Sequence, residues 1–197
     1  IITVHVDHSR YVDSRWYTGS GIYRNVKLIT LDKLHIPIWG SFVTTPEITK
    51  EKATINLELK VNNSNTKTNC FVLATKIVAP NGEVVATITE NKKVKAKEQQ
   101  VFNQKLVVNV PKLWHFNNPN MYKAVTTVTK KGITIDSYET PFGIRKVEFK
   151  VGEGFFLNGQ NTLIKGVCLH HDAGLVGAAV PKGGWRRRLQ KLKDGGV

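Results

Sequence analysis

The sequence is poor in cysteine and methionine and contains no long hydrophobic run. Its two cysteines, Cys70 and Cys168, are too few for the disulfide framework of a small secreted domain. Both lie in apolar runs, CFVLATKIV and LIKGVCL, which we expect to form buried strands where a free thiol behaves as a small hydrophobic group. No apolar run approaches the ~20 residues of a membrane-spanning helix, so we expect no membrane partner.

Acidic residues are also scarce: Lys and Arg number 29 against 15 Asp and Glu, which gives a formal net charge of +14. Such an excess would suit a polyanion, because a basic surface releases counterions from nucleic acid. The positive residues are mostly spaced singly along polar faces and are denser only in residues 92–97 and 186–193. We therefore interpret them as solvated surface charges and do not expect nucleic acid as a partner.

What the sequence does contain, after residue 35, is a series of short runs in which apolar and polar residues alternate. This period of two is typical of strands with one buried and one solvated face. The turn Pro80-Asn81-Gly82 separates two of the runs. About seven such strands within about a hundred residues indicate an immunoglobulin-like sandwich. The clearest runs are residues 53–62, 69–79, 84–89, 101–110, 122–130 and 133–140.

The two flanks of this series have a different character. Residues 1–6 and 21–31 alternate and predict two late strands of an unfinished sheet. Asn158-Gly159 predicts a type I′ turn between FFL and the strand TLIKGVCL. Residues 183–194 predict the one helix, whose apolar stripe is Trp185, Leu189 and Leu192. Strand, loop and helix in this order are the first unit of a βα fold, and a chain that starts and stops inside elements is expected to be a piece of a larger protein.

Four motifs of the chain resemble the linking motifs of glycoside hydrolase family 2, in the style of bacterial β-galactosidase-like enzymes. They occur in the family's order: SRWYTGSGIYRNVKL (14–28), TPFGIRKVEF (140–149), GFFLNGQNTLIKGVCLHHD (154–172) and WRRRLQKLKDGG (185–196). The resemblance implies a mainly β chain with three parts. These are the end of a jelly-roll sugar-binding domain (1–32), an immunoglobulin-like sandwich (33–147) and the start of a TIM-barrel catalytic domain (148–197).

The resemblance further implies a retaining hydrolase of β-glycosides, with β-galactosides favoured. Such enzymes use two carboxyl groups, and the family's two catalytic glutamates lie on later barrel strands, so no catalytic residue is assigned here. We expect this fragment alone to be inactive and to need no cofactor. Its partner in the complete enzyme would be a carbohydrate substrate. A bacterial periplasm or cytoplasm is the expected location, and homo-oligomerisation is left open.

The stretch LIKGVCLHHDAG holds the densest group of residues able to do chemistry near neutral pH. Neighbouring strand residues face opposite sides, so His170 and His171 are poorly spaced to chelate one metal ion, and we expect no metal site. TIM-barrel active sites form where the strands end. The resemblance implies that His170 hydrogen-bonds the sugar at the cleavage point. Asp172 is a second candidate, and a structural role in capping the strand or the loop is the alternative for both.

A second group of candidates lies before the GSGIYR turn. By resemblance, Asp13 contacts sugar hydroxyls and Arg15 is its neighbour at the pocket, whereas Trp16 more often packs a domain interface. A competing interpretation of the whole chain is a non-catalytic sandwich that binds carbohydrate or protein. We prefer the hydrolase, because a binding module would begin and end at domain boundaries.

Overall fold

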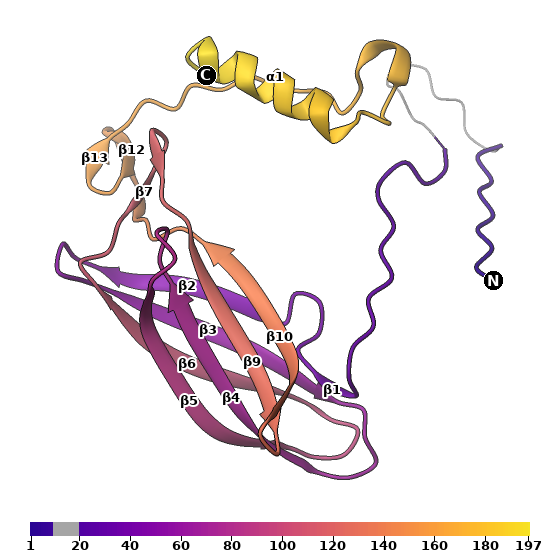
Figure 1. Ribbon diagram of the computed structural model, residues 1–197. Helices are drawn as coiled ribbons and strands as arrows, with labels where there is room; N and C mark the ends of the chain where they lie inside the picture. The colour runs from indigo at the N-terminus through magenta and orange to yellow at the C-terminus, as the bar shows by residue number, and fades with distance from the viewer. Residues whose placement is uncertain (10–19) are drawn as a thin grey trace. The chain divides into compact units, whose positions relative to one another are not determined.

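The computed structural model describes residues 1–9 and 20–197. The described chain divides into two compact units (Figure 1). One unit comprises Thr30–Thr162, and the other comprises Ile1–Ile29 together with Leu163–Val197. Each unit is described by itself.

The unit Thr30–Thr162 contains two antiparallel four-stranded sheets packed face to face (Figure 1). In the first sheet, β3 pairs with all three other members, which are β1, β2 and β6. Its strands are β1 (Leu34–His35), β2 (Ser41–Ile48), β3 (Lys52–Asn63) and β6 (Gln99–Asn109). The second sheet has the order β10 (Ile133–Phe142), β9 (Tyr122–Lys130), β4 (Asn69–Val78), β5 (Val84–Val94). The predicted mainly β sandwich is confirmed.

The core lies between the two sheets and follows the alternation in the sequence. On β3 the side chains of Ile55, Leu57 and Leu59 are at most 1% exposed, while the intervening Asn56 and Glu58 face solvent. Leu73 and Ile77 of β4 are fully buried on the opposing sheet. Burying each such side chain stabilises the fold by roughly 1.5–3 kcal/mol, which explains why these runs adopt one register.

A three-stranded sheet follows the sandwich within the same unit. It consists of β11 (Val147–Lys150), β12 (Gly154–Leu157) and β13 (Gln160–Asn161). Asn158 and Gly159 have φ values of 53° and 81°, and Leu157 pairs directly with Gln160. Two central residues with positive φ define the predicted type I′ turn, which is confirmed. A two-stranded ladder, β7 (Trp114–His115) and β8 (Asn118–Pro119), precedes β9.

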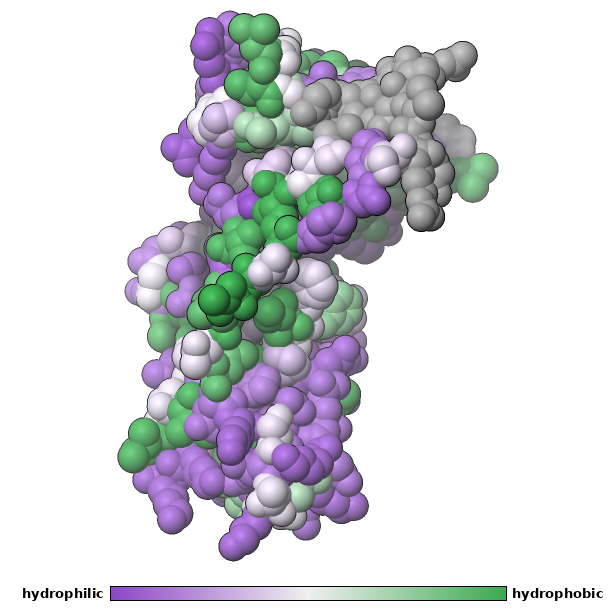
Figure 2. All heavy atoms as spheres, turned by 90° about the vertical axis from the view of Figure 1, so that its right-hand side faces the viewer, coloured by the Kyte–Doolittle hydropathy of each residue, from purple (hydrophilic) through white to green (hydrophobic). Residues whose placement is uncertain are grey.

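The other unit contains the short 3-10 helix η1 (Gly174–Val176) and the helix α1 (Lys182–Asp194). The strands expected at residues 1–6, 21–31 and 162–169 are absent, and this part of the prediction was wrong. A strand needs a neighbouring strand for its backbone N–H and C=O groups. Within the described residues these segments join no sheet, although the Thr162 N–H donates to the Phe155 carbonyl at 2.8 Å. Their apolar side chains remain at the surface: Leu28 is 91% exposed and Leu163 78% exposed. Hydrophobic residues are accordingly visible on the face shown in Figure 2.

The expectation that both cysteines are buried was also wrong, because Cys70 and Cys168 are exposed. Cys70 lies on β4, where Asn69 and Phe71 on either side of it point into the core. The alternation of a strand therefore turns Cys70 to the solvent face. Cys168 lies in the segment that forms no strand, so no second layer covers it.

Candidate functional site

The helix α1 is the element that positions the predicted site segment. Pro181 precedes its first turn with extended backbone angles, and the Gly195 N–H donates to the Lys191 carbonyl at 3.0 Å at its end. Proline suits the start of a helix because the first turn leaves N–H groups unpaired in any case. These boundaries agree with the predicted helix to within one residue.

The helix face that is covered differs from the predicted stripe. Trp185 and Leu192 are half-buried as expected, but Leu189 is 57% exposed and Arg188 is half-buried instead. The Arg188 guanidinium lies 5.2 Å from the centre of the Trp185 ring, a distance typical of a cation–π contact. Arginine can cover apolar surface with its methylene stem while its charged end finds a partner.

Arg188 connects the helix to the predicted sugar-binding segment. Its Nη1 donates a hydrogen bond of 2.8 Å to the backbone carbonyl of Asp172. A hydrogen bond from a charged donor is stronger than a neutral one, so it fixes the chain directly after the two histidines. The sequence interpretation assigned Arg188 to the solvated face and missed this contact. The half-buried position of Arg188 was indicated by its spacing of three residues from Trp185, because residues three apart lie on the same side of a helix.

His170 and Asp172 line one open depression of ≈ 460 Å³, together with Leu169, Arg188 and Leu192. His170 is exposed and Asp172 half-buried. An imidazole can donate or accept a hydrogen bond and a carboxylate accepts them, so this pair offers both functions to a polyhydroxyl ligand. The structure thus brings together the two site residues predicted after the barrel strand.

Tyr23 and Arg24, at the end of the GSGIYR motif, lie beside the segment that follows these histidines. Tyr23 and Arg24 line an open hollow of ≈ 640 Å³ with His171, Lys182 and Trp185. Arg24 is 5.4 Å from the centre of the Tyr23 ring. The predicted site residues that precede this motif, Asp13 and Arg15, lie outside the described residues, so their role stays a prediction.

A hydrogen-bonded joint connects the sandwich to the β11–β13 sheet. Asn158 exchanges two bonds with Lys146: its N–H donates to the Lys146 carbonyl at 2.8 Å, and its Oδ1 accepts from the Lys146 N–H at 3.0 Å. Its Nδ2 donates to the Trp114 carbonyl at 2.9 Å. A Cβ on Gly143 would meet the Trp114 Cβ at 3.0 Å, so a larger residue there would force Trp114 to shift by a few tenths of an ångström. Gly143 and Lys146 of the motif TPFGIRKVEF and Asn158 of the motif GFFLNGQ therefore act together to attach the β11–β13 sheet to the sandwich.

Two negative findings apply to residues 1–9 and 20–197. No group of three or more His, Cys, Asp or Glu side chains is arranged to hold a metal ion. No helix in this range is long and apolar enough to cross a membrane.

The described chain has the order of sandwich, hairpin, histidine pair and helix that the resemblance to a glycoside hydrolase led us to expect. Comparison with known families supports this class directly: the model of "Glycosyl hydrolases family 2" matches residues 35–145. The chain belongs to this family.

Relatives of known sequence extend the match to the whole chain. The "Beta-galactosidase BoGH2A" of Bacteroides ovatus is 40% identical over 197 residues, which cover 100% of this chain and 23% of the relative. A "Putative beta-glucuronidase" of Formosa agariphila is 36% identical over 196 residues, covering 100% of this chain and 18% of the relative. The chain therefore spans about a quarter or less of the length of these proteins.

Solved structures agree with the described fold. A family 2 member from Bacteroides cellulosilyticus superposes with a TM-score of 0.89 at 35% identity, over 98% of this chain and 26% of that structure. The Bacteroides uniformis beta-glucuronidase 2, covalently bound to cyclophellitol-6-carboxylate aziridine, gives a TM-score of 0.86 at 30% identity. This match covers 95% of this chain and 24% of that structure.

Proposed function

We propose that the chain is part of a retaining hydrolase of β-glycosides, most closely a β-galactosidase, in which it provides scaffold and one edge of the sugar pocket. The observation that carries this proposal is the 40% identity, over all 197 residues, to a protein named as a β-galactosidase. The catalytic carboxyl groups are assigned to parts of the enzyme beyond this chain. The chain by itself is then inactive.

The chemistry of such an enzyme requires two carboxyl groups about 5 Å apart. One protonates the departing oxygen and later activates water, and the other attacks the anomeric carbon to form a covalent glycosyl intermediate. His170 would donate a ring N–H to a hydroxyl of the sugar at the cleavage point. This hydrogen bond would accelerate the reaction to the extent that it strengthens as positive charge develops on the sugar ring.

Three further residues complete the proposed edge of the pocket. Asp172 would accept a hydrogen bond from a sugar hydroxyl, and Arg188 supports this role because it holds the Asp172 carbonyl at 2.8 Å. Asp13 and Arg15 would approach the same sugar from the end of the jelly-roll domain. Small displacements of bound substrate lower the rate greatly, so holding the sugar in place is the expected contribution of this segment.

The proposed division of the chain follows the family plan. Residues 1–32 would complete the jelly roll, 33–147 form the immunoglobulin-like sandwich and 148–197 begin the TIM barrel. The Asn158 joint supports a fixed exit from the sandwich, since its three hydrogen bonds tie the hairpin to Trp114 of β7 and to Lys146, the residue before β11.

β-Glucuronides are the second candidate substrate, because relatives in Formosa agariphila and Bacteroides uniformis are named as β-glucuronidases. A non-catalytic carbohydrate- or protein-binding sandwich is the alternative of another class. Substrate profiling of an active enzyme separates the first two, and any catalytic dependence on His170 argues against the third.

The test is a chimera in which this chain replaces the matching segment of the Bacteroides ovatus relative. The chimera should hydrolyse nitrophenyl β-galactoside, and His170→Ala should lower kcat/KM by about tenfold or more, with the unfolding temperature unchanged. The matched control is His171→Ala, which removes the adjacent imidazole and should change kcat/KM by less than about twofold. Equal rates for His170→Ala and the unsubstituted chimera would remove His170 from the site.

A further inference from the structure

One end of the sandwich gathers lysines that are far apart in the sequence. The register places Asn69 opposite Val94, Val72 opposite Thr129 and Leu34 opposite Asn63. The β3–β4 loop, the β5–β6 turn, the β9–β10 turn and the residue before β1 therefore meet at the same end, which is the lower end in Figure 1. We call this surface the basic end and define it by Lys33, Lys67, Lys93, Lys97 and Lys131.

The side-chain amide of Asn63 holds two of these segments in place. Asn63 is fully buried, and its Nδ2 donates to the carbonyls of Lys67, Val94 and Lys95 at 3.0, 3.0 and 2.9 Å. Its Oδ1 accepts from the Asn69 Nδ2 at 2.9 Å. The backbone that carries the lysines is therefore preorganised, and a ligand would not have to order it on binding.

The positive charge at the basic end is not neutralised by carboxylates. Two neighbouring lysines have acidic partners, Lys92 with Glu90 at 2.9 Å and Lys95 with Glu98 at 3.9 Å. Among the described residues, the five lysines of the basic end have no carboxylate within 4.0 Å. Lys97 donates instead to the Ser64 carbonyl at 2.8 Å, which leaves its charge intact. All five are exposed, so their charges face solvent.

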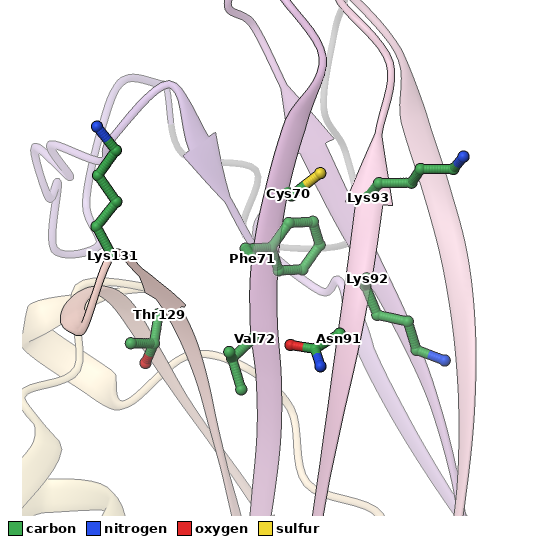
Figure 3. A pocket seen from close by; sticks show the side chains of 8 residues that line it. All are labelled: Cys70, Phe71, Val72, Asn91, Lys92, Lys93, Thr129 and Lys131. Carbon is green, nitrogen blue, oxygen red and sulfur yellow. The ribbon is translucent and has the colours of Figure 1, made fainter.

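An open pocket of ≈ 510 Å³ lies on the second sheet at this end. Figure 3 shows Lys131 on one side of β4 and Lys93 on the other, with Cys70 between them. Asn91 and Thr129 lie further along the pocket. An amide and a hydroxyl can both donate and accept, so the pocket combines hydrogen bonds for hydroxyl groups with two uncompensated cations.

We propose that the basic end binds an acidic polysaccharide, through carboxylate or sulfate groups spaced along the glycan. Charge complementarity favours an anionic ligand, and separated lysines act as point charges that fit anions on a flexible chain. Stacking of bases on aromatic side chains, the usual means of holding single-stranded nucleic acid, has no counterpart here, because Phe71 and Phe102 are buried. This binding does not depend on the hydrolase activity proposed above and is measurable on the chain itself.

The test measures binding of the 197-residue chain to polygalacturonate and chondroitin sulfate oligosaccharides by calorimetry at low and moderate salt. Binding should weaken as salt rises, and neutral dextran should not bind. The variant Lys67→Gln/Lys93→Gln/Lys131→Asn should bind at least about tenfold more weakly. Asparagine is chosen for Lys131 because φ there is 51°, and asparagine tolerates a positive φ.

The matched control is Lys50→Gln/Lys105→Gln/Lys112→Gln, which removes the same charge elsewhere on the sandwich. It should bind within about twofold of the unsubstituted chain. Equal weakening by both triple variants would mean that only net charge matters and would overturn the proposal. Tighter binding to single-stranded or duplex DNA than to either glycan would also overturn the proposal. The absence of glycan binding would overturn it as well. Chondroitin sulfate carries both carboxylates and sulfates and polygalacturonate only carboxylates, so comparing them shows whether sulfate groups add to binding. Lys93→Gln alone provides the test if the triple variant does not fold.

Discussion

Asn63 illustrates how one side chain organises several segments that are remote in the sequence. Its amide bonds carbonyls at positions 67, 94 and 95, and no apolar pattern in the chain indicates that these positions meet. Asn63→Ala would remove the buried hydrogen bond to the Val94 carbonyl, whereas the Lys67 and Lys95 carbonyls keep donors in the Asn69 Nδ2 and the Glu98 N–H. We therefore expect a loss of about 1–3 kcal/mol of unfolding free energy. Denaturant unfolding of the chain measures this.

The control for this prediction is Asn56→Ala on the same strand. Asn56 is exposed and faces away from the core, so its removal should change the unfolding free energy by less than about 0.5 kcal/mol. Similar losses for the two variants would contradict the role given to Asn63.

Glu90 makes the stability of the sandwich dependent on pH. A hydrogen bond from Lys92 lowers the pKa of Glu90 below its usual 4.5, burial opposes this shift, and a hydrogen bond from Gln104 adds to it. Because the folded pKa is lower than the unfolded one, the carboxylate stabilises the fold above about pH 4.5. That contribution is lost as the pH falls through the folded pKa.

We therefore expect Glu90→Gln to reduce the loss of stability that accompanies acidification below about pH 4.5. Unfolding temperatures measured from pH 7 to pH 3 provide the comparison. Glu139→Gln, which removes an exposed ion pair with Lys123, is the control and should follow the unsubstituted chain. Parallel curves for Glu90→Gln and the unsubstituted chain would contradict this account.

At the level of elements, the sandwich strands, the Asn158-Gly159 turn and the helix α1 were predictable because each is defined by local pattern. The alternation of β3 and the asparagine-glycine pair specify backbone geometry within a few residues. The strands expected at residues 1–6, 21–31 and 162–169 show the limit of that reasoning. Their patterns are those of strands, but a ladder depends on partners that a single segment does not reveal.

The candidate site was predictable to a similar extent. The position of His170 and Asp172 before a helix followed from the sequence, and both line one depression. The contact from Arg188 to the Asp172 carbonyl could not be predicted from the sequence, because it depends on which face of the helix is covered. The exposure of Cys70 was missed because an apolar run alone does not show which side of a strand is buried.

The Asn158 joint allows a prediction about backbone conformation. Asn158→Gly loses the side-chain bonds to Trp114 and Lys146 but keeps access to the positive φ of 53°. Asn158→Ala loses the same bonds and also pays for the left-handed conformation, at about 1 kcal/mol. Denaturant unfolding should therefore rank the alanine variant below the glycine variant. Equal stability would show that the backbone conformation of this turn is not a constraint.

At the scale of the whole molecule, the hydrophobic core separates the two units. The core cluster lies entirely within the sandwich unit. The segments before residue 30 and after residue 162 expose side chains such as Ile22 (60%) and Leu163 (78%). Apolar surface of this kind is typical of regions that contact further protein. It is consistent with the finding that the chain spans 23% of the Bacteroides ovatus relative.

The most direct measurement of the central claim is hydrolysis of a panel of nitrophenyl glycosides by two proteins: the 197-residue chain alone, and the chimera that joins it to the rest of the Bacteroides ovatus relative. The account predicts no turnover by the chain and turnover of the β-galactoside by the chimera, with retained anomeric configuration. Hydrolysis by the isolated chain would contradict the assignment of the catalytic carboxyl groups to other parts of the enzyme. A folded chimera without activity would contradict the proposal that this chain forms an edge of the sugar pocket.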